Sequence, residues 1–175
     1  MPKRSAPHRY GSVAVTFHWL SAVLLVVMLF SGSRVAEIDN PQSKLVLLRV
    51  HVCLGVAVLV MMLLRVGWWL AVDTKPVSVP MPAWQAWASR ALHVLLYVVV
   101  FGMGISGLGM LVLSDAFGPL FGAVSAALPD FWSVAPRAPH GVGARVLVVC
   151  IGLHAAAALY HQFVLRDGLL RRMWY

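Results

Sequence analysis

The stretch VLVVCIGLHAAAALYHQFVL, residues Val146–Leu165, runs for 20 residues without a charged side chain. A helix needs roughly 20 apolar residues to cross about 30 Å of hydrocarbon. Three further apolar windows lie at 10–33, 50–70 and 91–114, and only the second contains a charge, Arg65. The sequence therefore predicts four membrane-spanning helices, at about 12–33, 48–70, 90–113 and 139–164. We expect Arg65, close to a helix end, to extend to the membrane interface.

Composition supports this prediction. Of the 175 residues, 61% are hydrophobic and 11% are charged, and the mean hydropathy is +0.83. Soluble domains are about 45–50% apolar and about 25% charged. We therefore expect an all-α integral membrane four-helix bundle that forms a single domain over residues 1–175. The net charge of +8 comes from Lys and Arg at the ends of apolar windows, which favours a topology signal over nucleic-acid binding.

The distribution of basic residues predicts the orientation. With the N-terminus in the cytoplasm, nine Lys and Arg residues fall on the cytoplasmic side and five on the other side. The positive-inside rule then places both termini in the cytoplasm. We expect a multi-pass protein of a bacterial inner membrane, with the loop at 115–139 facing the periplasm.

Histidines are the chemically informative residues of the predicted spans. His140 and His154 are 14 residues apart, so they share one helix face about 21 Å apart along the axis. His51 matches the depth of His140, and His18, about 24 Å from the outer end of its helix, matches His154. Imidazoles at equal depth on facing helices are the usual axial ligands of b-type haem iron. We therefore predict two haems, held by the pairs His51–His140 and His18–His154.

Covalent haem attachment is not indicated, because the sequence has no Cys-x-x-Cys-His and both cysteines, Cys53 and Cys150, lie within apolar windows. The alternative for any single histidine is a packed residue that bonds a carbonyl of a neighbouring helix. We expect glycines next to the ligands to admit a porphyrin, and name Gly55, Gly141 and Gly143.

Two further histidines, His93 and His161, are predicted at one depth near the cytoplasmic surface. They could frame a quinone pocket, with Arg90 as a hydrogen-bond donor and Trp84 and Trp87 as an aromatic wall; simple solvation at the interface is the competing interpretation. The segment Gly102–Gly107 matches G-x-G-x-x-G, but it lies within a span and so indicates close helix packing instead of nucleotide binding.

Four segments carry a resemblance to a known family: Thr16–Trp19, Arg49–Gly55, Ala91–Tyr97 and Ile151–His161. Together they are similar to bacterial cytochrome b561, whose small di-haem members act as superoxide oxidases. The resemblance implies a superoxide:ubiquinone oxidoreductase with two haem b groups, which oxidises superoxide at the periplasmic face and reduces ubiquinone near the cytoplasmic haem. The alternatives are a cytochrome b subunit that anchors a dehydrogenase or hydrogenase, and a haem-free transporter or scaffold.

Superoxide is an anion, so basic residues near the outer ligands are candidate catalytic residues. Arg49 precedes His51 by two residues and Arg145 follows His140 by five. Such residues raise the local concentration of an anion and its rate of encounter. The competing interpretation is that they are interfacial anchors, a role that Arg and Lys fill at most helix ends. The outer loops carry five basic and four acidic residues, so the net charge of that face is only +1.

Overall fold

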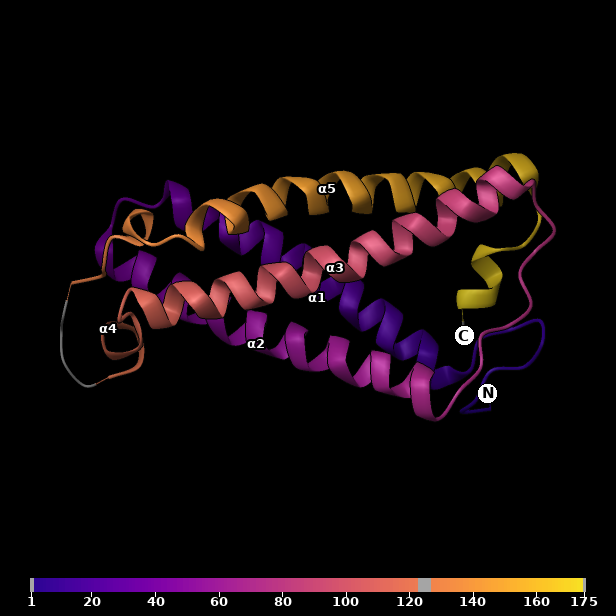
Figure 1. Ribbon diagram of the computed structural model, residues 1–175, viewed down its shortest axis with the longest axis horizontal. Helices are drawn as coiled ribbons and strands as arrows, with labels where there is room; N and C mark the ends of the chain where they lie inside the picture. Colours follow the sequence, from indigo (N-terminus) through magenta and orange to yellow (C-terminus); the bar gives the residue numbers. More distant parts are fainter. Residues whose placement is uncertain (1, 123–126, 175) are drawn as a thin grey trace.

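The computed structural model describes residues 2–122 and 127–174 (Figure 1). Its long helices are α1 (Ser12–Glu37), α2 (Pro41–Ala71), α3 (Ala83–Leu113) and α5 (Arg137–Tyr160). The short elements are α4 (Phe117–Phe121), the 3-10 helix η1 (Phe131–Ser133), the π-helical turn η2 (His161–Leu165) and the 3-10 helix η3 (Leu170–Met173). Within the described residues, four helices are long and apolar enough to span a membrane, with α5 and η2 forming the fourth, which confirms the predicted all-α bundle.

Two of the helices begin before the predicted spans. The α2 helix begins at residue 41, ahead of the span predicted from 48, and α3 begins at residue 83, ahead of the span predicted from 90. Asn40 caps α2, since its side chain accepts hydrogen bonds from the backbone N–H groups of Gln42 and Ser43, and Pro41 occupies the first turn. At 31 residues each, α2 and α3 are about 46 Å long and so extend beyond the hydrocarbon layer. Hydropathy therefore predicts the part of a helix that lies in the apolar layer, whereas the N-cap residue determines where α2 begins.

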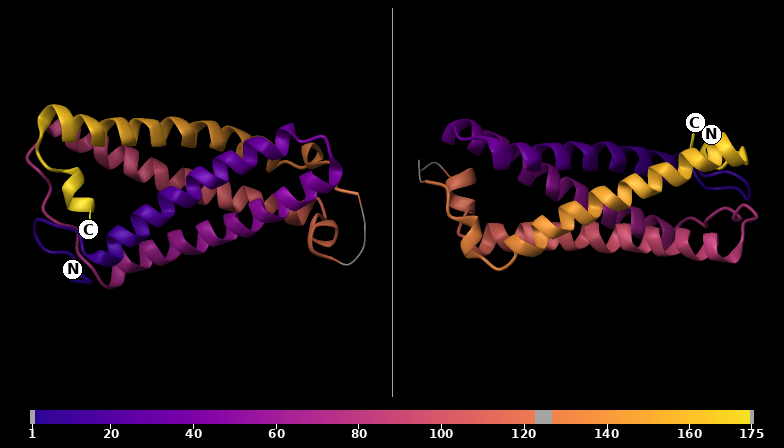
Figure 2. Two further views of the ribbon diagram at one scale, coloured as in Figure 1. Left: turned by 180° about the vertical axis from the view of Figure 1, so that it is seen from behind. Right: turned by 90° about the horizontal axis from the view of Figure 1, so that it is seen from above.

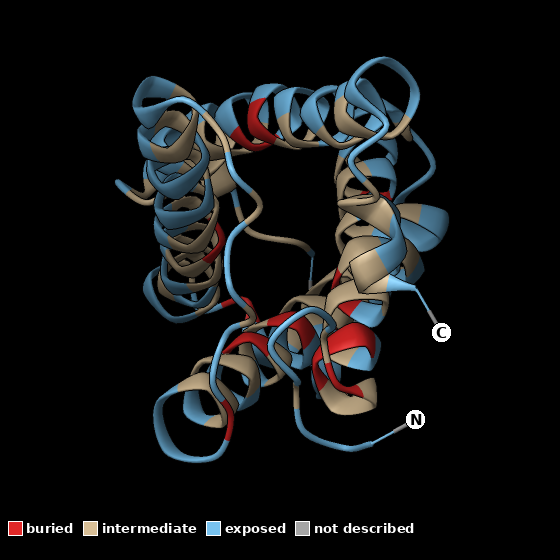
Figure 3. Cartoon of the chain, turned by 90° about the vertical axis from the view of Figure 1, so that its right-hand side faces the viewer, coloured by how far each residue is buried: buried red, intermediate tan, exposed pale blue. Residues whose placement is uncertain are grey.

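The helices form two pairs. The α1 helix packs on α2 and α3 packs on α5, while α2 and α3 provide the main contact between the pairs (Figure 2). Among the described residues, the backbones of α1 and α5 scarcely approach each other. A small core of Val58, Met62, Val100 and Leu147 joins the pairs at mid-length. Seen end-on, most of each helix is exposed or half-buried, as expected for helices whose outer faces contact lipid (Figure 3).

Both termini lie at one end of the bundle, here called the terminal end, and α4 lies at the other, the loop end (Figure 1). The Asp73 carboxylate, just after α2, fixes the N-terminal segment by accepting hydrogen bonds from the backbone N–H and hydroxyl of Ser5 at 2.9 and 2.8 Å. Arg172 donates to carbonyls of Pro7, His8 and Val77. The N-terminal segment, the α2–α3 loop and η3 therefore form one layer over the terminal end.

Candidate functional site

The predicted outer histidines meet between the two helix pairs, toward the loop end. His51 of α2 and His140 of α5 have ring centroids 6.3 Å apart, with ring planes at 72°. An iron held by two imidazole nitrogens, with metal–nitrogen bonds of about 2 Å, separates the centroids by about 6 Å. The spacing of these rings therefore fits an iron coordinated by both.

Two serines hold these rings. The Ser31 hydroxyl donates its proton to the Met28 carbonyl at 3.0 Å, so its oxygen can only accept from His51 Nδ1, 2.9 Å away. On α3, the Ser106 hydroxyl donates to the Met103 carbonyl at 3.1 Å and lies 3.1 Å from His140 Nδ1. Both Nδ1 atoms therefore carry the proton, which leaves each Nε2 unprotonated and able to bind a metal.

Two glycines allow the same rings to approach the neighbouring helix. A Cβ atom on Gly32 would lie 3.1 Å from His51 Cε1, and one on Gly107 would lie 3.3 Å from His140 Cε1. The two supports share one pattern, Met-x-x-Ser-Gly, at Met28–Gly32 on α1 and Met103–Gly107 on α3. We call each of them a Ser–Gly cradle. This internal repeat was visible in the sequence and was missed.

The glycines named from the sequence have other neighbours. Added Cβ atoms would meet Met28 at Gly55, Arg137 at Gly141 and Met103 at Gly143. These neighbours are side chains of Met and Arg, so the prediction that the three glycines admit a porphyrin stays a prediction. Helix packing does explain Gly104, whose added Cβ would lie 2.9 Å from Leu59 of α2. The glycines that contact the rings, Gly32 and Gly107, are distant in sequence from the histidines because each ring lies against the partner helix of its own pair.

The predicted inner histidines also meet, toward the terminal end. His18 of α1 and His154 of α5 have ring centroids 6.0 Å apart, although the backbones of these helices are well separated. This spacing too fits an iron between the rings. A third ring, that of His93 on α3, lies 5.1 Å from the His154 ring. His93 therefore belongs to the surroundings of the inner pair.

Arg65 contradicts its sequence prediction. Its Nη2 lies 3.4 Å from His18 Nδ1, and its guanidinium carbon lies 5.7 Å from the centroid of the Tyr97 ring. The side chain thus points to the inner histidines, not to the membrane interface. A charged group one turn and a half before the end of α2 can point either along the helix or across the bundle, and hydropathy does not distinguish the two directions.

The remaining predicted quinone residues have different neighbours. His161, at the start of the π-helical turn, is hydrogen-bonded through Nδ1 to the Asp167 carboxylate. Arg90 and Trp87 line a shallow groove of about 470 Å³ along α3, whereas Trp84 does not. A larger cavity of about 640 Å³ at the terminal end is lined by Gln162 and by residues of the N-terminal segment and the C-terminal region: His8, Arg9, Leu170, Arg171, Arg172 and Trp174.

Asp167 was not identified from the sequence, because it lies beyond the apolar window and its link to His161 depends on the local backbone. Arg166 adopts a left-handed conformation with φ 53°, which turns the chain back toward η2. Burial acts to raise the pKa of Asp167, but hydrogen bonds from His161 and from the backbone of Leu169 outweigh it and hold the pKa below its ordinary value. The carboxylate therefore stays ionised at neutral pH and orients the imidazole.

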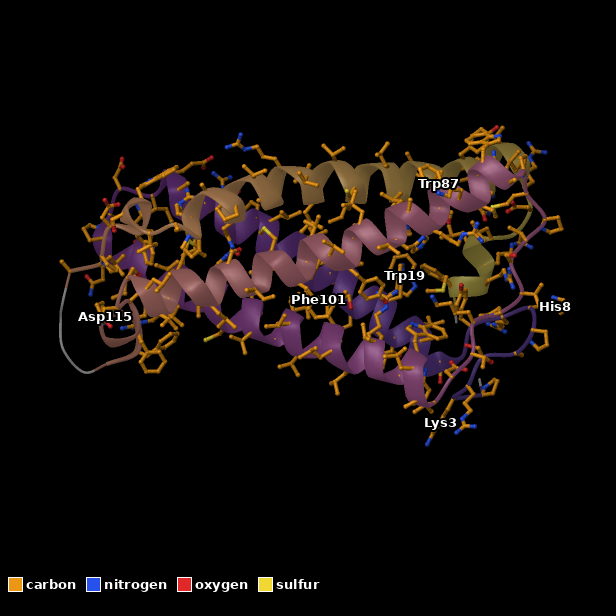
Figure 4. All side chains as sticks on the ribbon, viewed as in Figure 1. Lys3, His8, Trp19, Trp87, Phe101 and Asp115 are labelled. Atoms are coloured by element: carbon orange, nitrogen blue, oxygen red, sulfur yellow. The ribbon has the colours of Figure 1, made fainter. Side chains whose placement is uncertain are left out.

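The basic residues near the outer pair differ in their partners. Arg49 donates from Nε to the Leu120 carbonyl and so ties α4 to α2, whereas Arg145 is exposed on α5. Arg34 pairs with Glu37 at 2.9 Å, and the Arg137 guanidinium lies 4.1 Å from the centroid of the Trp132 ring. Figure 4 shows the side chains of this end, where Asp115 is labelled, and of the terminal end, where His8 is labelled.

Comparison with known proteins gives a consistent result. A model of the prokaryotic cytochrome b561 family matches residues 9–175. Cytochrome b561 homolog 2 of Escherichia coli strain K12 is 32% identical, over 97% of this chain and 93% of the relative. Probable superoxide oxidase CybB of Yersinia pestis is 29% identical, over 94% and 95% of the two chains. Cytochrome b562 of Cereibacter sphaeroides is 29% identical, over 94% of each.

These relatives match almost the full length of the chain, and the histidine geometry fits the b-type haem that the family name implies. The family indicated by the sequence resemblance is confirmed. The chain belongs to the prokaryotic cytochrome b561 family of membrane electron carriers.

Proposed function

We propose that this protein is a superoxide:quinone oxidoreductase with two haem b groups, one held by His51 and His140 and one by His18 and His154. Two superoxide anions each lose one electron and leave as dioxygen. One quinone gains the two electrons and two protons and leaves as quinol. When bound, haem b supplies a one-electron couple at each level of the bundle. The observation that carries the proposal is that two histidine pairs, each spaced for one iron, lie at different depths along α5.

The residues of this chain have three tasks in this scheme. The Ser–Gly cradles fix the tautomer and position of the outer ligand rings. Arg49 and Arg145 provide positive charge near the outer pair for an incoming anion. At the terminal end, the His161–Asp167 pair can pass a proton to a quinone oxygen, because an imidazole that a carboxylate orients can both donate and accept a proton.

The scheme also requires an orientation. We propose that the loop end faces the periplasm and the terminal end the cytoplasm, as the distribution of Lys and Arg favours. Protons for quinol would then come from the cytoplasmic side. The superoxide part of the proposal is supported by the similarity to the probable superoxide oxidase of Yersinia pestis.

The ligand assignment predicts the haem content of single variants. His154→Ala should lower the content from two haems per chain to one, and His140→Ala should remove the other haem, because each variant leaves an iron with one imidazole. His8→Ala, in the N-terminal segment, is the matched control and should keep both. Pyridine haemochrome spectra of the purified proteins measure this. Two haems in His154→Ala would contradict the assignment.

The Ser–Gly cradles predict a difference between two serines of α1. Ser31→Ala leaves His51 Nδ1 without its partner, so the outer haem should dissociate about 10- to 100-fold more readily. Ser33→Ala is the control, because the Ser33 hydroxyl bonds only the Phe30 carbonyl and is exposed. Haem transfer to excess apomyoglobin measures the rate. Equal rates in both variants would show that Ser31 does not hold the ligand.

Electrostatic steering predicts a dependence on salt. The second-order rate of haem reduction by superoxide should fall as ionic strength rises, and Arg145→Gln should lower it about 2- to 10-fold at low salt. Arg34→Gln should change it less, because Glu37 already neutralises that charge. Stopped-flow spectroscopy measures these rates. Rates that are independent of salt and equal in all proteins would show that the arginines are only interfacial anchors. If superoxide did not reduce the haem at all, the alternative of a cytochrome b subunit that serves a dehydrogenase would be favoured.

The quinone part predicts that His161→Gln and Asp167→Asn slow quinone reduction about 10-fold or more, through loss of a positioned proton donor, while haem reduction by superoxide is unchanged. His93→Gln tests the inner histidine in the same way. Arg90→Gln reports on the groove of α3. Quinol formation, followed by ultraviolet absorbance, distinguishes the sites: normal rates in His161→Gln and Asp167→Asn with a slow rate in Arg90→Gln would move the quinone to the α3 groove.

A further inference from the structure

Among the described residues, Arg65 is a cation inside the bundle that pairs with no carboxylate. Its Nε is buried and has no hydrogen-bond partner among the described residues. Its Nη2 faces a histidine nitrogen at 3.4 Å, which is a long hydrogen bond, and one face lies toward Tyr97. An arginine inside a membrane-spanning segment is costly and is normally paired. The donor that remains free points to a ligand that the protein itself does not provide.

The acidic residues of this end are already engaged. Asp73 accepts hydrogen bonds from Ser5, Trp68 and Thr74, and Asp167 accepts from His161 and Leu169. At the loop end, Glu37 pairs with Arg34 and Asp130 caps η1. Within the described residues, no carboxylate is hydrogen-bonded to Arg65. The free Nε donor of Arg65 is therefore available to an anion that enters the bundle with a ligand.

We propose that Arg65 binds a propionate carboxylate of the haem at the inner histidine pair. This inference rests on the proposed ligand assignment of His18 and His154. Haem b carries two propionates, and a guanidinium binds a carboxylate through two parallel N–H donors. Arg65 is next to His18, so it lies beside the group that this ring would hold. Binding a carboxylate would also draw Nη2 away from His18 Nδ1.

The positive charge has a predictable effect on electron transfer. Reduction of a ferric haem adds one negative charge, so a nearby cation stabilises the reduced state and raises the reduction potential. Loss of Arg65 removes this stabilisation and leaves a buried propionate unpaired, which acts in the same direction. Arg65 would thus be a positioning residue that also makes the inner haem the better electron acceptor.

Redox titration of the haem-loaded protein tests the inference. Arg65→Gln should lower the reduction potential of the inner haem by about 59 mV or more, which is a tenfold change in the equilibrium of a one-electron reduction. Arg65→Lys should recover part of this shift, since lysine keeps the positive charge but lacks the two parallel N–H donors of a guanidinium. Arg34→Gln is the control, because Arg34 is exposed at the loop end and already paired with Glu37, so its loss should leave the inner potential unchanged.

A second measurement keeps the test independent of folding and of the ligand assignment. Redox-induced infrared difference spectra, taken with haem labelled with ¹³C at its propionates, should show carboxylate bands that shift between wild type and Arg65→Lys. Unchanged bands and an unchanged inner potential in a protein with two haems would overturn the role of Arg65. Two haems in His154→Ala would instead overturn the ligand assignment, so the two failures are distinguishable.

Discussion

The site depends on imidazole rings that face each other between the two helix pairs, which otherwise meet mainly through α2 and α3. His18 and His154 meet at 6.0 Å although α1 and α5 scarcely touch, and His51 and His140 meet at 6.3 Å between α2 and α5. Buried contact between the pairs is small, being centred on Val58, Met62, Val100 and Leu147. A shared ligand between the pairs would therefore contribute to assembly as well as to electron transfer, because metal binding to a folded site stabilises that fold.

The two histidine levels are supported differently. At the outer level both rings bond a serine hydroxyl and pack against a glycine, and α1 and α3 supply these supports through the same five-residue pattern. At the inner level His18 faces Arg65 and His154 lies beside a third histidine. The outer level is thus arranged to fix two neutral ligands, whereas the inner level adds a positive charge. In the proposed scheme, this asymmetry favours electron flow from the outer to the inner haem.

The sequence was sufficient for the number of long apolar helices and for which histidines meet, because hydropathy and a 3.6-residue period determine depth and face along a helix. The family followed from the resemblance of four segments. It did not predict which glycines touch the rings, since Gly32 and Gly107 lie on the neighbouring helix of each pair. It also placed Arg65 at the interface and did not identify Asp167 as the partner of His161. These residues depend on helix rotation and on the chain beyond the apolar windows, including the turn at Arg166 that brings Asp167 to His161.

The haem content of the purified wild-type protein tests the central claim most directly. Iron and pyridine haemochrome assays, referred to protein concentration from amino-acid analysis, should give two haem b per chain, and low-temperature electron paramagnetic resonance of the oxidised protein should show two low-spin signals. These are the values expected when both histidine pairs coordinate iron on two sides. One haem per chain, or a high-spin signal from one of two haems, would contradict the claim that both pairs are ligands.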